Sequence, residues 1–150
     1  MRRVYLDCNA VDPFVDFPGA VTLAKEAVAN GELELLFSHV TLDELAAVRD
    51  VDRREALRSV LAEIGRHVST GAVAWDVSKW DEARWSDDDQ LIERLNVGNE
   101  KNTRDALHAA TALAERCELV TSDIRLTRRA VREGVTVTSP VNLLRDLGVV

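Results

Sequence analysis

The chain has 150 residues, of which 46% are hydrophobic and 30% are charged. These fractions are typical of a globular domain and exclude a disordered or fibrous chain. A chain of this length can bury about two-thirds of its unfolded surface in one core. We therefore expect a single domain over residues 1–150.

Charge and cysteine content limit the partners and the compartment. The net charge is −7, whereas nucleic-acid-binding domains usually carry a surplus of lysine and arginine, so any such binding must depend on a local group of residues. Cys8 and Cys117 lack the spacing of metal ligands and predict buried thiols in a reducing cytosol. Only three apolar-type residues precede Asp7, too few for a signal-peptide core or a membrane span. We therefore expect a cytoplasmic protein with no membrane contact.

The first half of the chain alternates short apolar runs with amphipathic segments. One run ends at Asp7 and is followed by a proline-containing region typical of a turn or loop. Apolar residues then recur at helical spacing as far as Asn30-Gly31, a typical helix stop. In chain order, we expect a strand over 4–6, a loop over 9–19, a helix over 21–28, a strand over 33–37, a helix opened by residues 38–41, and a charged helix over about 52–67.

The second half contains one irregular stretch and one strongly apolar helix. Residues 76–101 are polar and acidic, and together with Trp75 they hold all three tryptophans, which either stack on RNA bases or pack this segment against the domain. Alanine and leucine cover most of the helix predicted over 102–117, which indicates burial. The remaining expected elements are an extended segment over 73–77, a strand over 119–121, a basic helix over 126–132, a strand over 135–138 and a helix over 140–147.

This alternation predicts an α/β fold in which helices cover both faces of a parallel sheet. In such a sheet, ligands bind outside the carboxyl ends of the strands, where Asp7 and Asp123 directly follow strand-like runs. Glu44 lies early in a helix that follows a strand. Asp105 lies in the first turn of a helix that runs back toward the start of the next strand. The topology therefore predicts that these four acids share one edge of the sheet.

Carboxylates without clustered histidines or thiols suit Mg²⁺ or Mn²⁺ and are a poor match for zinc. Such an ion can polarise a phosphate, generate hydroxide from bound water and stabilise the leaving oxygen. The four acids therefore predict metal-dependent hydrolysis of a phosphodiester.

The four acids also lie in motifs. They stand in Asp7-Cys8-Asn9, in VTLDELAAV with Glu44, in DALHAATAL with Asp105, and in VTSDIRL with Asp123. In order and spacing these motifs resemble those of the PIN-domain family, in particular the VapC-like toxin ribonucleases. The resemblance spans residues 3–139, and the last two motifs are its specific part.

This resemblance implies a compact three-layer α/β/α fold with a mainly parallel central sheet. It also implies an endoribonuclease that depends on Mg²⁺ or Mn²⁺, with RNA as substrate, frequent homodimers and a cognate antitoxin protein. The chain departs from the family in its acidic segment from Trp75 to Asp89, and in Ser122, where the family often has asparagine.

Ordinary helix capping offers a second interpretation of the acids. Thr41-x-x-Glu44 has the pattern of a capping box, and Asn102-x-x-Asp105 is similar. Asp7 and Asp123 are equally suited to turns or N-caps. Capping alone therefore accounts for any one of these acids. Their predicted position at one shared edge of the sheet favours a metal-binding site.

Several polar residues accompany the acids. Asn9, Thr121 and Ser122 either orient water and carboxylates in support of the site or form turns. His108, one turn after Asp105, either lies near the site or is a packed or hydrogen-bonded residue of a buried helix, and we prefer the second interpretation. Basic residues near Asp105 and Asp123 are natural phosphate contacts, unless they simply face solvent: Arg104, Arg125 and Arg128, with Lys101, Arg129 and Arg132 beside them.

Two other functions fit the same sequence. One is a PIN-like interaction module that keeps the fold and the acids but has no turnover, and the other is a housekeeping or defence nuclease that is not a toxin. A haloacid-dehalogenase-type phosphatase would need a second acid where Asn9 stands, and a phospho-receiver domain would need a late lysine, but no lysine follows Lys101.

Overall fold

The computed structural model describes residues 1–70 and 103–150. The extended segment expected over 73–77, the three tryptophans, Lys101 and the Asn102 cap lie outside these described residues.

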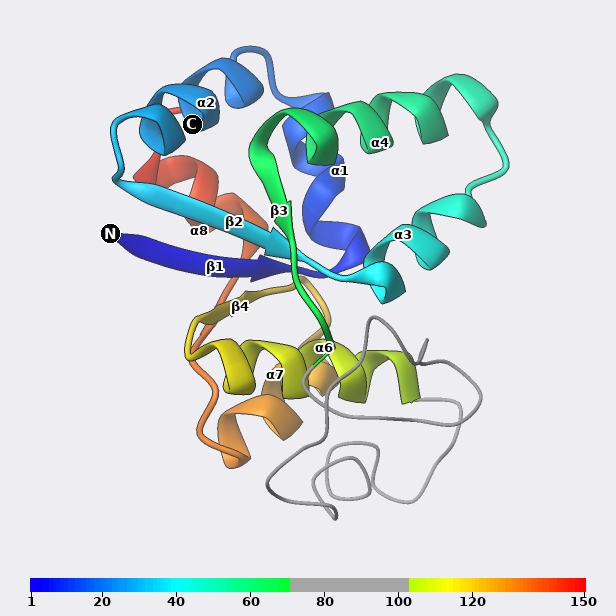
Figure 1. The fold of residues 1–150 in the computed structure, drawn as a ribbon, viewed down its shortest axis with the longest axis vertical. Coiled ribbons are helices and arrows are strands. Elements are labelled where there is room, and N and C mark those ends of the chain that lie inside the picture. Colours follow the sequence, from blue (N-terminus) through cyan, green and yellow to red (C-terminus); the bar gives the residue numbers. More distant parts are fainter. Residues whose placement is uncertain (71–102) are drawn as a thin grey trace.

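A five-stranded sheet forms the middle of the molecule, with strand order β3-β2-β1-β4-β5 (Figure 1). Every neighbouring pair is parallel. The strand β1 is central, and Val4 is in register with Leu35 on one side and Glu118 on the other. The strands are β1 (Arg2–Leu6), β2 (Leu33–Phe37), β3 (Gly65–His67), β4 (Glu118–Val120) and β5 (Val137–Thr138).

Helices cover both faces of this sheet, which confirms the predicted three-layer α/β/α architecture (Figure 1). One layer contains α1 (Cys8–Asp16), α2 (Ala20–Ala29), α4 (Val51–Ile64) and α8 (Pro140–Asp146), and the other contains α6 (Thr103–Glu115) and α7 (Ile124–Arg132), while α3 (His39–Ala46) follows β2 at the edge. No helix in these described parts of the chain is both long and apolar enough to cross a membrane.

The alternation of side chains along β1 divides the core into two parts. Val4 and Leu6 pack with α1, α2, α4 and α8, whereas Tyr5 packs with α6 and α7 on the other face. Because both faces of β1 are buried, its sequence is continuously apolar rather than alternating. Tyr5 is thus the one residue among these three that brings a polar atom into the core.

The loop predicted over 9–19 is wrong, because most of it forms helix α1. Pro13 lies inside this helix, although a proline cannot donate the usual backbone hydrogen bond. The helix persists because Asp7 caps its first turn and because Val11 and Phe14 bury its apolar face in the core.

The charged helix predicted to reach residue 67 ends at Ile64, and the next three residues form the edge strand β3. A strand of three residues is too short to show the period of two by which strands are recognised. The remaining predicted elements in the described ranges agree with the structure to within two or three residues, including 33–37, which matches β2.

Gly65 allows β3 to approach β2 closely. A Cβ atom at this position would lie 2.7 Å from the ring of Phe37 and 2.9 Å from the carbonyl oxygen of Leu61. We expect Gly65→Ala to lower the free energy of unfolding by about 1–3 kcal/mol through overpacking, measured by urea denaturation. Ser59→Ala, on the exposed side of α4, is the control and should change it by less than about 0.5 kcal/mol. Equal stability of the two variants would contradict this packing.

Candidate active site at the carboxyl edge of the sheet

The structure places all four acids at the carboxyl edge of the sheet. Asp7 directly follows β1 and caps α1, and Asp123 follows β4 after two residues and caps α7. Glu44 lies in α3, which starts where β2 ends, and Asp105 lies in the first turn of α6. Each position follows from the parallel topology, in which every strand ends at the same edge.

Thr121 connects the first and the last of these acids. Its hydroxyl donates to Oδ2 of Asp7 over 2.5 Å and accepts a hydrogen bond from the backbone N–H of Asp123 over 3.1 Å. The second oxygen of Asp7 accepts from the backbone N–H of Ala10 over 2.9 Å. Because β1 and β4 are neighbours in the sheet, this threonine can hold the buried Asp7 carboxylate in one orientation.

A buried polar chain connects Glu44 to the central strand. His108 has no exposed surface; its Nε2 lies 2.5 Å from Oε1 of Glu44, and its Nδ1 lies 2.8 Å from the hydroxyl of Tyr5. The Tyr5 hydroxyl also lies 2.7 Å from Oγ of Ser38, the N-cap of α3. These hydrogen bonds therefore connect β1, the start of α3 and α6 with Glu44.

The charges around His108 determine its protonation. Burial alone would lower its pKa, but the Tyr5 oxygen and the Glu44 and Asp7 carboxylates outweigh burial and raise the pKa to about 10. At neutral pH, His108 therefore donates through both ring nitrogens, to Glu44 and to Tyr5. The Tyr5 hydroxyl can then donate to Ser38.

The acids influence one another through their negative charges. Burial raises the pKa of Asp105; Asp123 and Glu44 raise it further, while His108 and Arg129 oppose them. Burial also raises the pKa of Asp7, against the hydrogen bonds from Thr121 and Ala10 and the charge of His108. Ionisation of Asp7 and of Asp105 is therefore disfavoured relative to a free aspartate.

The side chains do not form a ready-made metal site. Among residues 1–70 and 103–150, no three histidine, cysteine, aspartate or glutamate side chains are placed to hold a common ion. Both oxygens of Asp7 already accept hydrogen bonds, as does one oxygen each of Glu44 and Asp123. The oxygen donors suit a hard cation, but their arrangement requires side-chain movement before one can be held.

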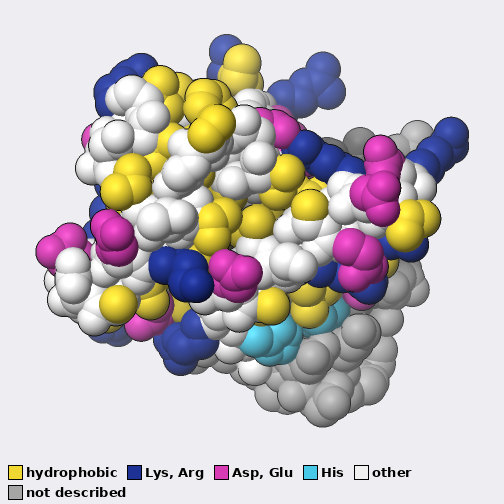
Figure 2. Space-filling model, turned by 90° about the horizontal axis from the view of Figure 1, so that it is seen from above, with side chains coloured by type: hydrophobic (Ala, Val, Ile, Leu, Met, Phe, Trp, Pro, Cys, Tyr) yellow, Lys and Arg dark blue, Asp and Glu magenta, His cyan; other side chains and the backbone are white. Residues whose placement is uncertain are grey.

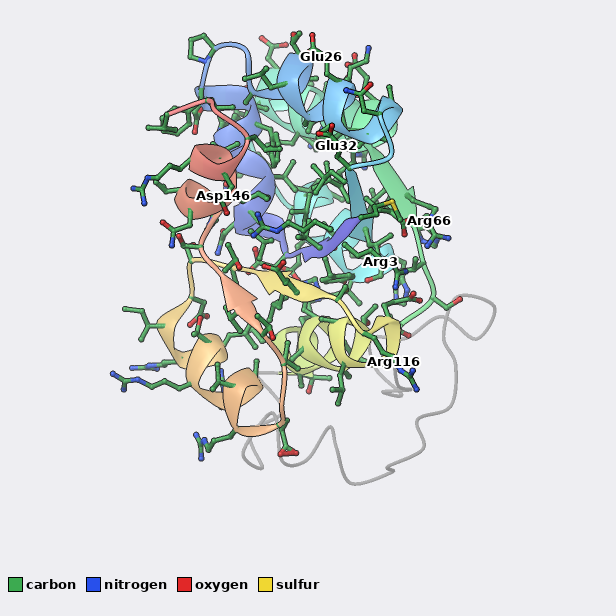
Figure 3. The ribbon with its side chains drawn as sticks, turned by 90° about the vertical axis from the view of Figure 1, so that its left-hand side faces the viewer. Arg3, Glu26, Glu32, Arg66, Arg116 and Asp146 are labelled. Atoms are coloured by element: carbon green, nitrogen blue, oxygen red, sulfur yellow. The ribbon has the colours of Figure 1, made fainter. Side chains whose placement is uncertain are left out.

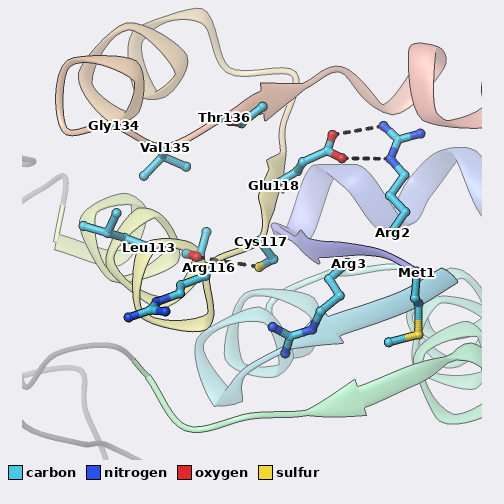
Figure 4. A pocket seen from close by; sticks show the side chains of 11 residues that line it. Met1, Arg2, Arg3, Leu113, Arg116, Cys117, Glu118, Gly134, Val135 and Thr136 are labelled. Atoms are coloured by element: carbon cyan, nitrogen blue, oxygen red, sulfur yellow. Dashed lines mark hydrogen bonds and ion pairs between the residues drawn. The ribbon is translucent and has the colours of Figure 1, made fainter.

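The opposite edge of the sheet contains a pocket of about 510 Å³ (Figure 4). Its walls come from the starts of β1 and β4, the end of α6, and the turn before β5. Arginines such as Arg3 and Arg116 lie on this side of the molecule together with acids (Figure 3). Arg2 pairs with Glu118, and Arg3 pairs with Glu34 and Glu115. This pocket therefore does not contain the predicted acids.

Acids at the two edges have opposite pKa shifts. The hydrogen bond from Arg2 lowers the pKa of Glu118. Burial would raise the pKa of Glu34, but Arg66 and Arg3 outweigh it and lower it. At the carboxyl edge, in contrast, Asp7 and Asp105 have raised pKa values. Acids with a raised pKa and no arginine partner are candidates for functional sites.

The capping interpretation holds for two of the acids and is wrong for Glu44. Asp7 and Asp123 accept hydrogen bonds from the first backbone N–H groups of α1 and α7. Helix α3, however, begins after Ser38, and the hydroxyl of Thr41 donates instead to the carbonyl oxygen of Leu6. Glu44 therefore has no capping role, and its recorded partner is His108.

The other predicted site residues lie on the surface. Asn9 and Ser122 are exposed, and so are the three arginines predicted to contact phosphate, Arg104, Arg125 and Arg128. The helices α1, α2 and α4 cover the face seen in Figure 2, where acidic and basic side chains are interspersed. This face offers no extended positive patch for a nucleic acid.

Comparison with known proteins identifies the fold family. The sequence model named PIN domain matches residues 4–132. The chain belongs to the PIN domain family. Among curated proteins, no sequence matches the chain significantly. PIN domains are generally nucleases, so the family matches the chemistry expected from the acids.

Solved structures share this PIN fold at low sequence identity. VapBC2 from Rickettsia felis, bound to a DNA fragment from its promoter, has 14% identity and a TM-score of 0.58, over 91% of this chain and 98% of that one. PAE2754 from Pyrobaculum aerophilum has 20% identity and a TM-score of 0.55, over 98% and 97%. VapBC-1 from nontypeable Haemophilus influenzae has 15% identity and a TM-score of 0.53, over 93% and 98%. At these identities, the likeness establishes the fold.

The sequence interpretation overlooked the residues that support Glu44. His108 was treated as a core residue, and Tyr5 and Ser38 were read only as parts of a strand and a helix start. The available signal was that His108 lies three residues after Asp105, so that both side chains lie on the same side of α6. A histidine there, on an otherwise apolar helix, needs polar partners when it is buried.

We expect His108→Leu to lower the free energy of unfolding by about 1–3 kcal/mol in buffer with EDTA, because Tyr5 and Glu44 both lose a buried partner. The raised pKa of His108 means that its contribution is complete below pH 6.5, its unfolded value, and is lost as pH rises toward about 10. The groups around it are Tyr5, Glu44, Asp7 and Asp105.

Urea denaturation between pH 6 and pH 10 tests this prediction, with Tyr5→Phe as the matched variant that removes only the hydroxyl. The difference between wild type and His108→Leu should shrink as the pH rises. A difference independent of pH would show that His108 contributes by packing alone.

Proposed function

We propose that this PIN domain is an endoribonuclease that depends on Mg²⁺ or Mn²⁺ and uses Asp7, Glu44, Asp105 and Asp123. The observation that carries this proposal is the contrast between the two edges of the sheet. Acids at the amino edge are paired with arginines, whereas Asp7, Asp105 and Asp123 have no ion pair with any described residue. Acids left uncompensated at the ligand-binding edge are suited to a cation.

Several carboxylate oxygens of these acids remain available to a cation. The hydrogen bonds leave Oε2 of Glu44, Oδ2 of Asp123 and both oxygens of Asp105 without a partner among the described residues. When bound, a divalent ion supplies a Lewis acid that polarises the phosphate and acidifies water. Its binding would also relieve the repulsion that raises the pKa of Asp105.

The supporting residues would fix the acids in place. Thr121 and the first turn of α1 hold Asp7, and His108 holds one oxygen of Glu44 while leaving the other available. The exposed Arg104, Arg125 and Arg128 would contact phosphates of the RNA strand, and Asn9 and Ser122 would orient water.

RNA as the substrate and a toxin role rest on the motifs shared with VapC-like toxins and on the similarity in fold to VapBC proteins. In this proposal the cytoplasmic protein forms a homodimer and is held inactive by a cognate antitoxin. The three tryptophans lie outside the described residues, so this proposal does not depend on them.

A non-enzymatic PIN module is the second candidate. It is favoured by the absence, among the described residues, of three acids arranged around one point, and by the capping roles of Asp7 and Asp123. In such a module, the buried polar chain would serve stability alone.

Cleavage of labelled RNA separates these two functions. We expect the wild type to cut single-stranded RNA with Mg²⁺ or Mn²⁺ but not in EDTA. Asp7→Asn should lower the rate by at least about 100-fold, since even outer partners of metal ligands are worth about 10- to 100-fold. The asparagine retains an oxygen that can cap α1, so its fold is expected to survive. No cleavage by either protein with either metal would favour the non-enzymatic module.

Asp105→Asn tests the shared electrostatic environment. The raised pKa of Asp105 means that its ionised form costs stability above that pKa. In EDTA at pH 7, the variant should therefore melt at the same temperature as wild type or higher. This difference should vanish as pH falls below 3.8, the ordinary pKa of an aspartate, because the carboxyl is then protonated in both the folded and the unfolded state. The rise in melting temperature caused by Mn²⁺ should be smaller in the variant than in wild type.

Asp52→Asn is the matched control, since Asp52 is an exposed acid in the first turn of α4. It should leave the effect of Mn²⁺ unchanged. An unchanged effect of Mn²⁺ in Asp105→Asn would refute the role of Asp105 as a ligand.

A further inference from the structure

Arg129 differs in its hydrogen bonding from the other arginines that the structure describes. Its side chain is only 8% exposed, and its buried Nε has no hydrogen-bond partner among the described residues. The buried or half-buried arginines elsewhere, such as Arg2, Arg3 and Arg53, form ion pairs with acids. A buried donor atom without an acceptor is unfavourable, and among the nitrogens of this guanidinium Nε is the one in that situation.

The position of Arg129 directs it toward the acids. It lies on the buried face of α7 with Leu126 and Ala130, the face that packs against α6. Side chains on a helix lean toward its N-terminus, and α7 begins at Asp123 on the carboxyl edge. The positive charge of Arg129 acts on Asp105, yet the two form no ion pair within 4.0 Å.

These observations leave a donor without an acceptor beside a group of anions. If Arg129 served only to neutralise Asp105, a direct ion pair would be the favourable arrangement, because guanidinium and carboxylate match in geometry. The guanidinium instead keeps its donors available near the acids. A tetrahedral phosphate oxygen is an acceptor suited to this fork.

We propose that Arg129 binds a backbone phosphate of the RNA strand at the acidic edge, in preference to the exposed arginines of α6 and α7. This inference rests on the proposed function and names a residue that contacts the substrate directly. The cation that the acids attract and the guanidinium of Arg129 would then hold the strand from two sides.

The test follows the Arg129 Nε–H signal in ¹⁵N NMR spectra recorded in EDTA, where no cleavage occurs. The signal is identified by its absence in Arg129→Lys. We expect it to shift on addition of inorganic phosphate, and to shift at lower concentration with a four-nucleotide RNA. A signal that moves with neither probe, or with inorganic phosphate only, would overturn the proposal.

Two substitutions separate ligand binding from a structural role. Arg129→Met should weaken binding of the four-nucleotide RNA by about tenfold or more, the loss expected for one charge-assisted hydrogen bond. It should melt at or above the wild-type temperature in EDTA, because it removes a buried Nε–H donor that has no acceptor. A lower melting temperature would show instead that the charge stabilises the fold, and would overturn the proposal.

Arg128→Met is the control, since Arg128 is the exposed neighbour on the same helix. It should weaken RNA binding by less than Arg129→Met does, and equal losses would count against a special role of Arg129. The outcome is independent of turnover. If the protein binds RNA through Arg129 but cuts no RNA, the nuclease proposal fails alone. If it cuts RNA and Arg129→Met leaves KM unchanged, only the present inference fails.

Discussion

The hydrogen-bonded chain from Ser38 through Tyr5 and His108 to Glu44 is the interaction on which the carboxyl edge depends. Its members come from β1, the start of α3, and α6, elements that are distant in sequence. Tyr5 and His108 are fully buried, so neither can exchange these partners for water. Buried polar groups of this kind are costly when unpaired, which favours the single arrangement in which all are satisfied. The relative positions of β1, α3 and α6, and hence of three site acids, follow from that requirement.

The two edges of the sheet differ in how their acids are paired. At the amino edge, Arg2 forms an ion pair with Glu118, and Arg3 forms one with Glu34. These ion pairs connect β1 to its two neighbouring strands. At the carboxyl edge, only Glu44 has a cationic partner among the described residues, and that partner is a histidine. Acids that are already paired with arginines are less available to bind a ligand than the unpaired acids of the carboxyl edge.

The sequence was sufficient for the fold and for the edge at which the acids lie. Strands such as 33–37 and the apolar helix beginning near Asp105 have strong periodic patterns, and parallel topology then places Asp7 and Asp123 on one edge. Helix α1 was missed because Pro13 is a strong local signal for a break, whereas the burial of Phe14 that overrides it is a tertiary effect. The edge strand β3 was missed because it is defined by pairing with β2 rather than by its own pattern.

The details of the site were less accessible from the sequence. The Thr41-x-x-Glu44 pattern suggested that Thr41 caps a helix, but the N-cap of α3 is Ser38, three residues earlier. Thr41 therefore lies inside α3, and its hydroxyl donates to the Leu6 carbonyl. His108 was left out because a lone histidine on a buried helix usually packs in the core, and Arg129 was grouped with its exposed neighbours because its burial depends on how α7 packs. Which partners such a residue finds depends on neighbouring helices, and a single sequence does not specify them.

The remaining question is how a protein of net charge −7 could attract a polyanion. Four helices, α1, α3, α6 and α7, begin at the carboxyl edge, and the N-terminus of each carries a partial positive charge. Asp7 and Asp123 each occupy one such N-terminus, which partly offsets the cost of keeping their carboxylates ionised. A divalent cation bound by these acids would cancel much of their negative charge, after which the helix ends and Arg129 would dominate the local field. Binding of the metal would then strengthen the attraction of RNA beyond what Arg129 provides alone, and the overall charge of the protein would matter little.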